Sequence, residues 1–354
     1  MYYQVGNQCL EQHQAENVYF SLVVPKITED GKIIKPEYNG KDWKIDGQII
    51  KADLPETDYR KFSNDEQGCK NLKEWISAKR EKDIYVCMEA TGNYYEQAAD
   101  CLAEEYHVSV INPLKIKAYA QKRFSRVKND KQDAKLIAEF CQTALIEELP
   151  KREKPTEQQY SLKRLLSLQS QLLEQQTSQK NRIKAAKDSF VQKIHEKQLK
   201  ELENHLNAVK KKIDQTIKSD KKMKELTKRL ETIPSVGKTT AISLMSYLIN
   251  STFENAKQFT AYAGLNPHQN ISGTSVNKKS KMTKYGNRRI RGSLFMAALV
   301  AFKNNYFPAF TNRLKKAKKP KMLIIGALMR KILVVAFNLY KTETDFDKTR
   351  YQTA

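Results

Sequence analysis

The chain has 354 residues and carries 63 Lys and Arg against 40 Asp and Glu, a net charge of +23. This length predicts two or three domains, and the excess of positive charge favours a polyanionic partner. The five cysteines form no C-x-x-C pair and accompany no His cluster, which argues against structural zinc. No run of about 18 apolar residues occurs, so we expect no membrane span and a soluble protein of a reducing cytoplasm.

The charge is unevenly distributed along the chain. Residues 1–150 carry a net charge of −4, residues 151–232 carry +10 and residues 233–354 carry +17. A near-neutral first part followed by a strongly basic last part is typical of a protein that binds nucleic acid. These three ranges are the expected domains.

Strands alternate with helices between residues 83 and 143. The segments DIYVCMEATG (83–92) and HVSVINP (107–113) each read as a strand followed by a turn. Helical periodicity follows at 93–106, 115–123 and 130–143. Such alternation predicts an α/β domain with a partly parallel sheet, in which ligands bind at the carboxyl ends of the strands. Glu89 lies at such an end.

Two aspartates open the last of these helices. Asp130 and Asp133 are three residues apart, so their carboxylates point the same way, ahead of the apolar Leu136 and Ile137. Acidic residues in a first helical turn also complement the helix dipole, an explanation that needs no active site. Together with Glu89 they are the residue types that hold divalent metals for phosphoryl transfer. The expected metal is Mg²⁺ or Mn²⁺.

The middle of the chain reads as long helices. Residues 156–233 contain no Gly and no Pro, which predicts one long helix or a helical hairpin, with Ser219 and Asp220 as a possible new start. A narrow apolar stripe of the coiled-coil kind is formed by Leu202, Leu206, Val209, Ile213 and Ile217. The stripe fits two helices of a bundle as well as it fits an intermolecular coiled coil.

The last part combines a helical hairpin with a basic loop. LETIPSVGKTTAISL resembles a helix-hairpin-helix turn, whose backbone N–H groups face a DNA phosphate. A loop rich in Gly, Ser and Lys follows, and then a helix that opens on arginines. The predicted nucleic-acid contacts are Lys238, Lys278, Lys279, Lys284, Arg288, Arg289 and Arg291. Residues 322–340 are apolar around Arg330 and Lys331 and predict a buried amphipathic helix.

Four blocks occur in the order found in one known family. The blocks are CMEATGNYYEQAADCL, INPLKIKAYAQKRFSRVKNDKQDAKLIAEF, LETIPSVGKTTAISL, and AYAGLNPHQNISGTSV with the later KYGNRRIRGSLFMAALVA. Together they resemble the DEDD transposases of the insertion sequence one-ten family, relatives of the Piv and MooV invertases. The resemblance covers roughly Phe62 to Tyr340, and four blocks in order are far more specific than any one of them.

The resemblance implies an α/β part followed by a mainly α part. Residues 1–150 would form a RuvC-like nuclease domain with an RNase H-like fold, residues 151–232 a helical coiled coil, and residues 233–354 an α-helical transposase domain with the helix-hairpin-helix turn. On the family pattern Glu89, Asp130 and Asp133 are the second, third and fourth acids. The nucleophilic serine falls on Ser272, with Ser275 as the second choice, although a serine beside a glycine is more often part of a turn.

The resemblance also implies partners. The family cuts and rejoins DNA through a covalent serine–DNA link, and its members use a structured noncoding RNA from the element itself to bridge target and donor DNA. The serine and the acids stand in different predicted domains, so we expect a composite active site in a homo-oligomer, a dimer or tetramer. The basic middle and end permit RNA binding but do not by themselves predict it.

The first acid of the family pattern is missing. Family members begin with a strand and a G-[IV]-D-x-[SA]-K type stretch, whereas here Asn7 and Gln8 follow Val5 and Gly6. A second register, anchored on NVYFSLVV, places Glu11 and Gln12 there instead. A carboxamide in place of a carboxylate weakens a metal site. Three functions therefore stay open: an active transposase, a catalytically decayed nucleic-acid-binding remnant, and a junction-resolving nuclease.

Overall fold

The computed structural model describes residues 2–5, 17–23, 37–38, 43–45, 48–50, 58–78, 84–90, 92, 94–122, 130–144, 149–249, 253–272 and 276–349. Of these, the residues before 60 and residues 130, 131 and 269–280 are described by their backbone alone. The chain forms two compact units, Met1–Lys154 and Pro155–Ala354, called here the first and the second unit.

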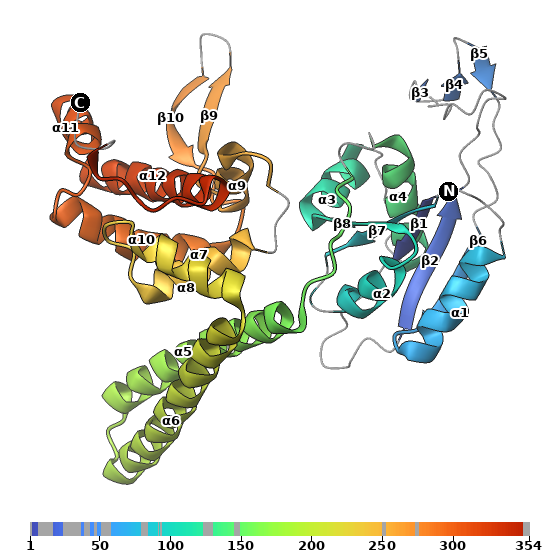
Figure 1. The fold of residues 1–354 in the computed structure, drawn as a ribbon. Helices are drawn as coiled ribbons and strands as arrows, with labels where there is room; N and C mark the ends of the chain where they lie inside the picture. The colour runs from blue at the N-terminus through green and yellow to red at the C-terminus, as the bar shows by residue number, and fades with distance from the viewer. Residues whose placement is uncertain are drawn as a thin grey trace. The chain divides into compact units, whose positions relative to one another are not determined.

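A five-stranded mixed sheet lies at the centre of the first unit (Figure 1). Its strand order is β6-β2-β1-β7-β8, that is, Asp58–Ser63, Asn17–Val23, Tyr2–Val5, Tyr85–Glu89 and His107–Ile111. β1 is antiparallel to β2 and parallel to β7, and β7 is parallel to β8. The partly parallel sheet predicted from the alternating strands and helices is thus confirmed. A separate small sheet contains β3 (Glu37–Tyr38), β4 (Trp43–Ile45) and β5 (Gln48–Ile50).

Helices cover both faces of the five-stranded sheet. α1 (Glu66–Ser77) and α2 (Tyr95–Leu102) pack on the face that contains Val86 and Met88 of β7. α3 (Pro113–Lys122) and α4 (Asp130–Thr143) pack on the opposite face, around Cys87. Because side chains alternate between the faces of a strand, a strand buried on both sides is continuously apolar, as residues 85–88 are.

Two disulfides join these layers. Cys69 of α1 is bonded to Cys101 of α2, and Cys87 of β7 to Cys141 of α4. The Cα atoms are 6.6 Å apart in the first pair and 6.1 Å apart in the second, within the usual range of a disulfide. The sequence did not predict either pair, because 32 and 54 residues separate the partners.

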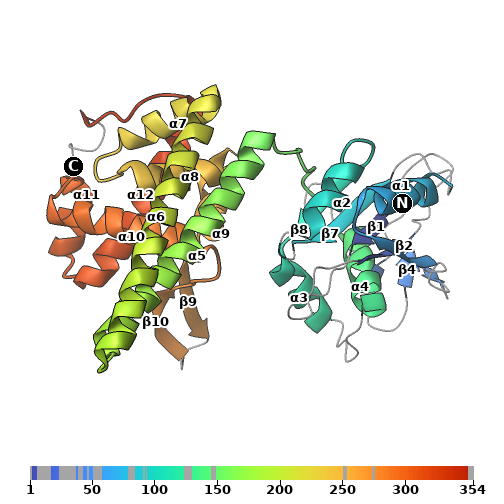
Figure 2. The ribbon, with the colours of Figure 1, turned by 90° about the horizontal axis from the view of Figure 1, so that it is seen from below.

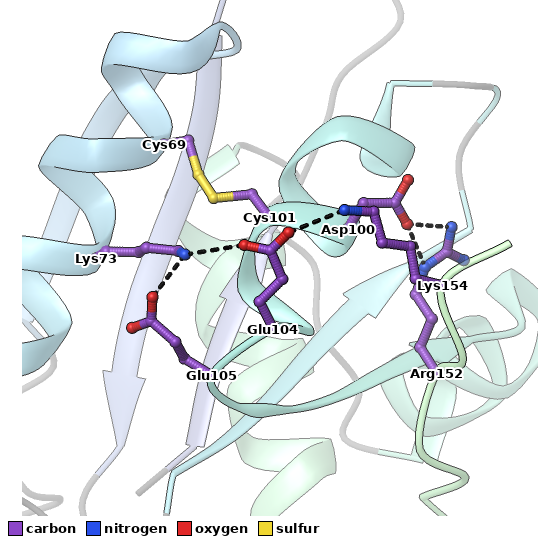
Figure 3. Close-up of polar contacts among 8 residues, drawn as sticks. All are labelled: Cys69, Lys73, Asp100, Cys101, Glu104, Glu105, Arg152 and Lys154. Atoms are coloured by element: carbon purple, nitrogen blue, oxygen red, sulfur yellow. Dashed lines mark hydrogen bonds and ion pairs between the residues drawn. A yellow bond between two sulfur atoms is a disulfide. The ribbon is translucent and has the colours of Figure 1, made fainter. Parts of the chain in front are cut away.

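An ion-pair network anchors the end of the first unit (Figure 3). Arg152 donates from Nε and Nη2 to Asp100 Oδ1, over 3.0 and 2.8 Å. Lys73 of α1 and Lys154 both pair with Glu104, at 3.5 and 2.9 Å. The network therefore connects α1, the end of α2 and the segment that leads to the second unit.

The second unit begins with a hairpin of two long helices, α5 (Glu157–Ala185) and α6 (Ser189–Ser219), which lie side by side in Figures 1 and 2. The predicted apolar stripe of α6 faces the core of the same chain, where Leu206, Val209, Ile213 and Ile217 are buried. Asp220 then caps α7 (Lys221–Glu231), accepting a hydrogen bond from Met223 N–H at 3.0 Å. The predicted new helix start at this position is confirmed.

The described part of the second unit contains five more helices. They are α8 (Lys238–Leu248), α9 (Ala256–Tyr262), α10 (Arg288–Lys303), α11 (Pro308–Lys316) and α12 (Lys321–Thr342). A single hydrophobic core, which extends from Leu162 to Leu339, joins them to α5, α6 and α7. Among the described helices, α12 alone is long and apolar enough to cross a membrane. Ten of its residues are buried in this core, as predicted for residues 322–340.

One expectation about the second unit was wrong. The segment predicted as a basic loop forms an antiparallel β-hairpin of β9 (Pro267–Ser272) and β10 (Val276–Met282). The hairpin projects from the helices in Figure 1. Its sequence, PHQNIS followed by VNKKSKM, contains few apolar residues, so neither strand shows the alternation that marks a half-buried strand.

Candidate active site

Glu89 is the last residue of β7, at the carboxyl end of the parallel part of the sheet. Side chains alternate along a strand, so Glu89 shares the face of Cys87, which is the face covered by α3 and α4. The residue is half-buried. Its carboxylate therefore belongs to the side of the sheet that α4 covers.

α4 turns its own acid toward the same face. Asp133, Ile137 and Cys141 follow one another at intervals of four, and residues so spaced lie on one side of a helix. Ile137 and Cys141 are buried against the sheet, and Cys141 is bonded to Cys87. Asp133, half-buried, continues this row toward the beginning of the helix.

The direction of α4 brings its first turn toward Glu89. The chain beyond α4 reaches Leu149, whose carbonyl oxygen is 2.9 Å from His107 Nε2 at the first residue of β8. The end of α4 thus lies toward the starting edge of the parallel strands, and its beginning toward their carboxyl edge. Glu89 and Asp133 consequently stand on facing elements at the same edge of the sheet.

The structure describes only part of the predicted metal site. Asp130 opens α4, but its side chain lies outside the described residues, as do Asn7, Gln8 and Glu11. Among the side chains that are described, no three of His, Cys, Asp or Glu come together as a metal site. β1 ends at Val5, opposite Met88, so the chain leaves β1 at the edge where Glu89 lies.

Ser272 lies at the far end of the β-hairpin. It is the last residue of β9 and pairs with Val276, the first residue of β10. Its side chain, and the whole of Ser275, lie outside the described residues. The base of the hairpin is held by two backbone hydrogen bonds, from Thr283 N–H to the Asn266 oxygen at 3.0 Å and from Lys284 N–H to the Gly264 oxygen at 3.2 Å.

The exposed cations predicted to bind nucleic acid surround this base. Lys284, Arg288 and Arg289 are exposed, and the Arg289 guanidinium reaches Ser167 Oγ of α5 at 3.4 Å. Lys281, also exposed on β10, was not among the predicted residues. The alternation of a β-strand would have pointed to it, had the hairpin been recognised. Lys278 and Lys279 lie on β10, with side chains outside the described residues.

Two other residues predicted to contact nucleic acid are bonded to groups of the protein itself. Arg291 is half-buried and donates from Nη1 to the carbonyl oxygen of Ala263 at 3.0 Å. Lys238, the first residue of α8, pairs with Asp214 of α6 at 2.7 Å. The side chain of Arg291 therefore supports the fold, whereas Lys238 is more than half exposed and joins two helices at the α7–α8 turn.

Family models match two stretches of the chain. A transposase model for the DEDD transposases of the IS110 group matches residues 42–191, and a model described as the transposase IS116/IS110/IS902 family matches residues 227–313. This chain is 31% identical over 297 residues to each of two pilin gene-inverting proteins, from Moraxella bovis and Moraxella lacunata. The aligned residues cover 81% of this chain and 90% of each relative. The chain belongs to the IS116/IS110/IS902 family of transposases.

Membership of the IS116/IS110/IS902 family confirms the resemblance drawn from the four blocks, and it supports DNA transposition and recombination as the general activity. The mixed sheet is consistent with the RNase H-like fold expected of its DEDD domain. Glu89, Asp130 and Asp133 fall within the first matched stretch and Ser272 within the second. The first match begins at residue 42, so the position of the missing first acid precedes it.

Proposed function

We propose that this protein cuts and rejoins DNA for the movement of an insertion sequence, with Glu89, Asp130 and Asp133 as metal-binding acids and Ser272 as the nucleophile. The observation that carries the proposal is the position of Glu89 and Asp133 on facing elements at the carboxyl edge of the sheet. Ligand sites of α/β proteins form at this edge. Membership of a transposase family supports DNA as the substrate.

The donor set suits a hard divalent cation. Glu89, Asp130 and Asp133 offer carboxylate oxygens only, the ligands that Mg²⁺ and Mn²⁺ prefer. A bound pair of such ions would polarise a phosphodiester and stabilise the attacking and leaving oxygens. The three side chains would hold the ions at the edge of the sheet. Asp133 lies on the same side of α4 as Ile137 and Cys141, which pack against the sheet.

Ser272 would attack the phosphorus of a DNA phosphodiester. The new bond joins Ser272 Oγ to phosphorus, the bond to one deoxyribose oxygen breaks, and the serine proton is passed on to that leaving oxygen. In the rejoining step a deoxyribose hydroxyl of the new partner strand would attack the phosphorus, the bond from phosphorus to Ser272 Oγ would break, and the proton of that hydroxyl would pass to Ser272 Oγ. A serine hydroxyl is a weak nucleophile, so it depends on the carboxylate site for activation.

The reaction needs both units and polyanionic partners. The acids belong to the first unit and Ser272 to the second, so we propose that the serine of one copy works with the acids of another in a dimer or tetramer. A structured noncoding RNA would guide the choice of DNA. The exposed Lys284, Arg288 and Arg289, and the N–H groups that open α8 at the helix-hairpin-helix turn, would contact phosphates.

The metal proposal is tested with Asp133→Asn. This variant should lose DNA cleavage while its unfolding midpoint and its affinity for DNA stay within error, because only the charge of one ligand is removed. Lys135→Gln, an equally small change on α4, is the control and should cleave normally. Cleavage by Asp133→Asn at the wild-type rate would refute the assignment.

The serine proposal is tested by trapping a protein–DNA adduct on labelled DNA under denaturing conditions. The wild type should form the adduct and Ser272→Ala should not. If the adduct persists in Ser272→Ala but is lost in Ser275→Ala, the nucleophile is Ser275. Cleavage by the wild type without any adduct would instead identify a junction-resolving nuclease.

A second candidate function is favoured by one observation, the absence of an aspartate after β1. Asn7 and Gln8, or Glu11 and Gln12 in the second register, stand where the first family acid is expected, and a catalytically decayed, nucleic-acid-binding remnant would bind DNA without cutting it. Aspartate placed at each of these positions in turn separates the two: an inactive wild type whose cleavage is restored by one of these substitutions is a remnant, whereas a wild type that cleaves on its own is an active transposase.

A further inference from the structure

A cavity of about 700 Å³ opens beside the turn between α7 and α8. Three segments distant in the sequence line it: the turn itself at 231–237, the turn between α10 and α11 at 305–308, and the segment beyond α12. Phe346 ties the last of these in place, since its N–H donates to Thr232 Oγ1 at 2.9 Å and its ring packs edge-on against Phe307. The cavity is therefore built by tertiary contacts within the second unit.

Ser235 belongs to the turn that lines the cavity. Its Oγ is enclosed by protein and has no hydrogen-bond partner among the described residues. The residue also has a φ of 77°, a backbone conformation that a non-glycine residue seldom adopts. Both features cost free energy, so the packing around the turn must hold it in this conformation.

The other lining groups match the parts of a nucleotide. Tyr306 keeps 41% of its surface exposed, enough for a base to stack on its ring. Asn305 accepts from Thr311 Oγ1 at 2.7 Å through its side-chain oxygen, so its amide nitrogen is the atom left to donate to a base edge. Lys348 adds a positive charge at the wall, suited to a phosphate.

We propose that this cavity binds one unpaired nucleotide of the bound nucleic acid, with its base against Tyr306, its edge hydrogen-bonded by Asn305, and its phosphate near Lys348. The volume lies in the range of pockets for small organic ligands, larger than a single phosphate needs. Unpaired bases are the features that proteins read by stacking and edge contacts. The inference rests on the proposed nucleic-acid binding and adds a structural preference to it.

The test compares the full chain on two short duplexes, one fully paired and one with a single bulged 2-aminopurine, in a DNA arm and an RNA arm. The wild type should bind the bulged duplex about tenfold more tightly in at least one arm, the gain expected from stacking one base. The fluorescence of the 2-aminopurine should fall on binding. The arm with the larger preference identifies the nucleic acid that supplies the nucleotide.

Variants separate the cavity from the rest of the surface. Tyr306→Ala should reduce the preference, Tyr306→Phe should keep it, and Phe190→Ala, an exposed aromatic residue on α6, is the matched control that should also keep it. Unchanged thermal unfolding shows that each variant is folded. A preference that survives Tyr306→Ala, or equal affinity of the wild type for both duplexes, would overturn the inference and leave the proposed recombination intact. If the wild type binds neither duplex, both this inference and the proposed nucleic-acid binding are refuted.

Discussion

Arg152 donates two hydrogen bonds to one oxygen of Asp100, and the two side chains are only 13% and 16% exposed (Figure 3). Arg152 also donates its backbone N–H to the Val108 oxygen at 2.7 Å, so it lies along β8. The guanidinium approaches the Tyr95 ring at 5.5 Å. One residue thus fastens the end of the first unit to α2 and to the sheet.

Replacing this arginine should destabilise the first unit. Arg152→Ala removes the two charged hydrogen bonds to the half-buried Asp100, and we expect a loss of about 2 kcal/mol in the free energy of unfolding. Both tryptophans, Trp43 and Trp75, belong to the first unit, so urea unfolding followed by tryptophan fluorescence measures it. Lys154→Ala, which removes an exposed ion pair, should leave the midpoint unchanged within error. Equal shifts in the two variants would contradict the special role of Arg152.

The cap of α1 should make stability depend on pH. Asp65 accepts from Gly68 N–H at 2.7 Å and from Ser63 Oγ at 2.9 Å, and these bonds, the first above all, hold the pKa of its carboxyl below its ordinary value of 3.8. The ionised form therefore stabilises the folded state above the unfolded pKa. This contribution is lost as the pH falls through the folded pKa.

The comparison of wild type with Asp65→Asn isolates that charge, because asparagine is also a good helix cap. The wild type should be the more stable at pH 6, and its advantage should shrink as the pH falls below 3.8. Tryptophan fluorescence is a direct probe, since Trp75 belongs to α1. An advantage that stays constant from pH 6 to pH 3 would contradict the assignment.

Two glycines of the second unit should respond to alanine in opposite directions. At Gly286 the backbone has a φ of 148°, and a Cβ would lie 2.3 Å from the Tyr262 oxygen. Gly286→Ala should cost at least about 2 kcal/mol. A Cβ at Gly292, inside α10, would meet nothing within 4 Å, so Gly292→Ala should stabilise by about 0.5–1 kcal/mol. Thermal unfolding followed by circular dichroism measures both changes. A Gly286→Ala variant as stable as the wild type would show that the Tyr262 oxygen can move away from the added Cβ.

Arginines at the start of α10 should differ in their effect on DNA binding. Arg288 is exposed, whereas Arg291 is bound to the Ala263 oxygen. We expect Arg288→Gln to lower the slope of log affinity against log salt by about 0.9, the release of one counterion. Arg291→Gln should leave that slope unchanged and lower the melting temperature instead. Titration of a DNA duplex at several salt concentrations measures the slopes, and the reverse pattern would reassign the two side chains.

Local patterns in the sequence predicted the elements that bury many apolar side chains. β7 and β8, the stripe of α6, the cap at Asp220 and the buried α12 each depend on neighbours along the chain, so periodicity and capping residues reveal them. The same reasoning placed Glu89 at a strand end and Asp133 in the first turn of a helix. Their position on the same side of the sheet follows from the alternation on β7 and the spacing of four on α4.

Features made by distant or polar residues escaped prediction. The β9–β10 hairpin buries little, so its strands lack an apolar period, and the disulfide between Cys87 and Cys141 depends on how α4 crosses the sheet. The inward turn of Arg291 depends on the Ala263 carbonyl, 28 residues away in the sequence. Ser272 as a nucleophile rests on the family resemblance, because a serine before a glycine has no pattern of its own.

A small rotation of the β-hairpin at its base moves Ser272, at its far end, through a large distance. β9 has six residues, so Ser272 lies five steps from Pro267 at its base, a length of about 17 Å at about 3.3 Å per residue. A rotation of about ten degrees at the base would move Ser272 by about 3 Å. This is the difference between van der Waals contact with a reacting atom and a separation too large for reaction. In the proposed reaction, bound DNA and a second copy of the chain would have to fix the position of Ser272 at this distance from the base. A single copy of the chain is therefore expected to leave DNA uncut.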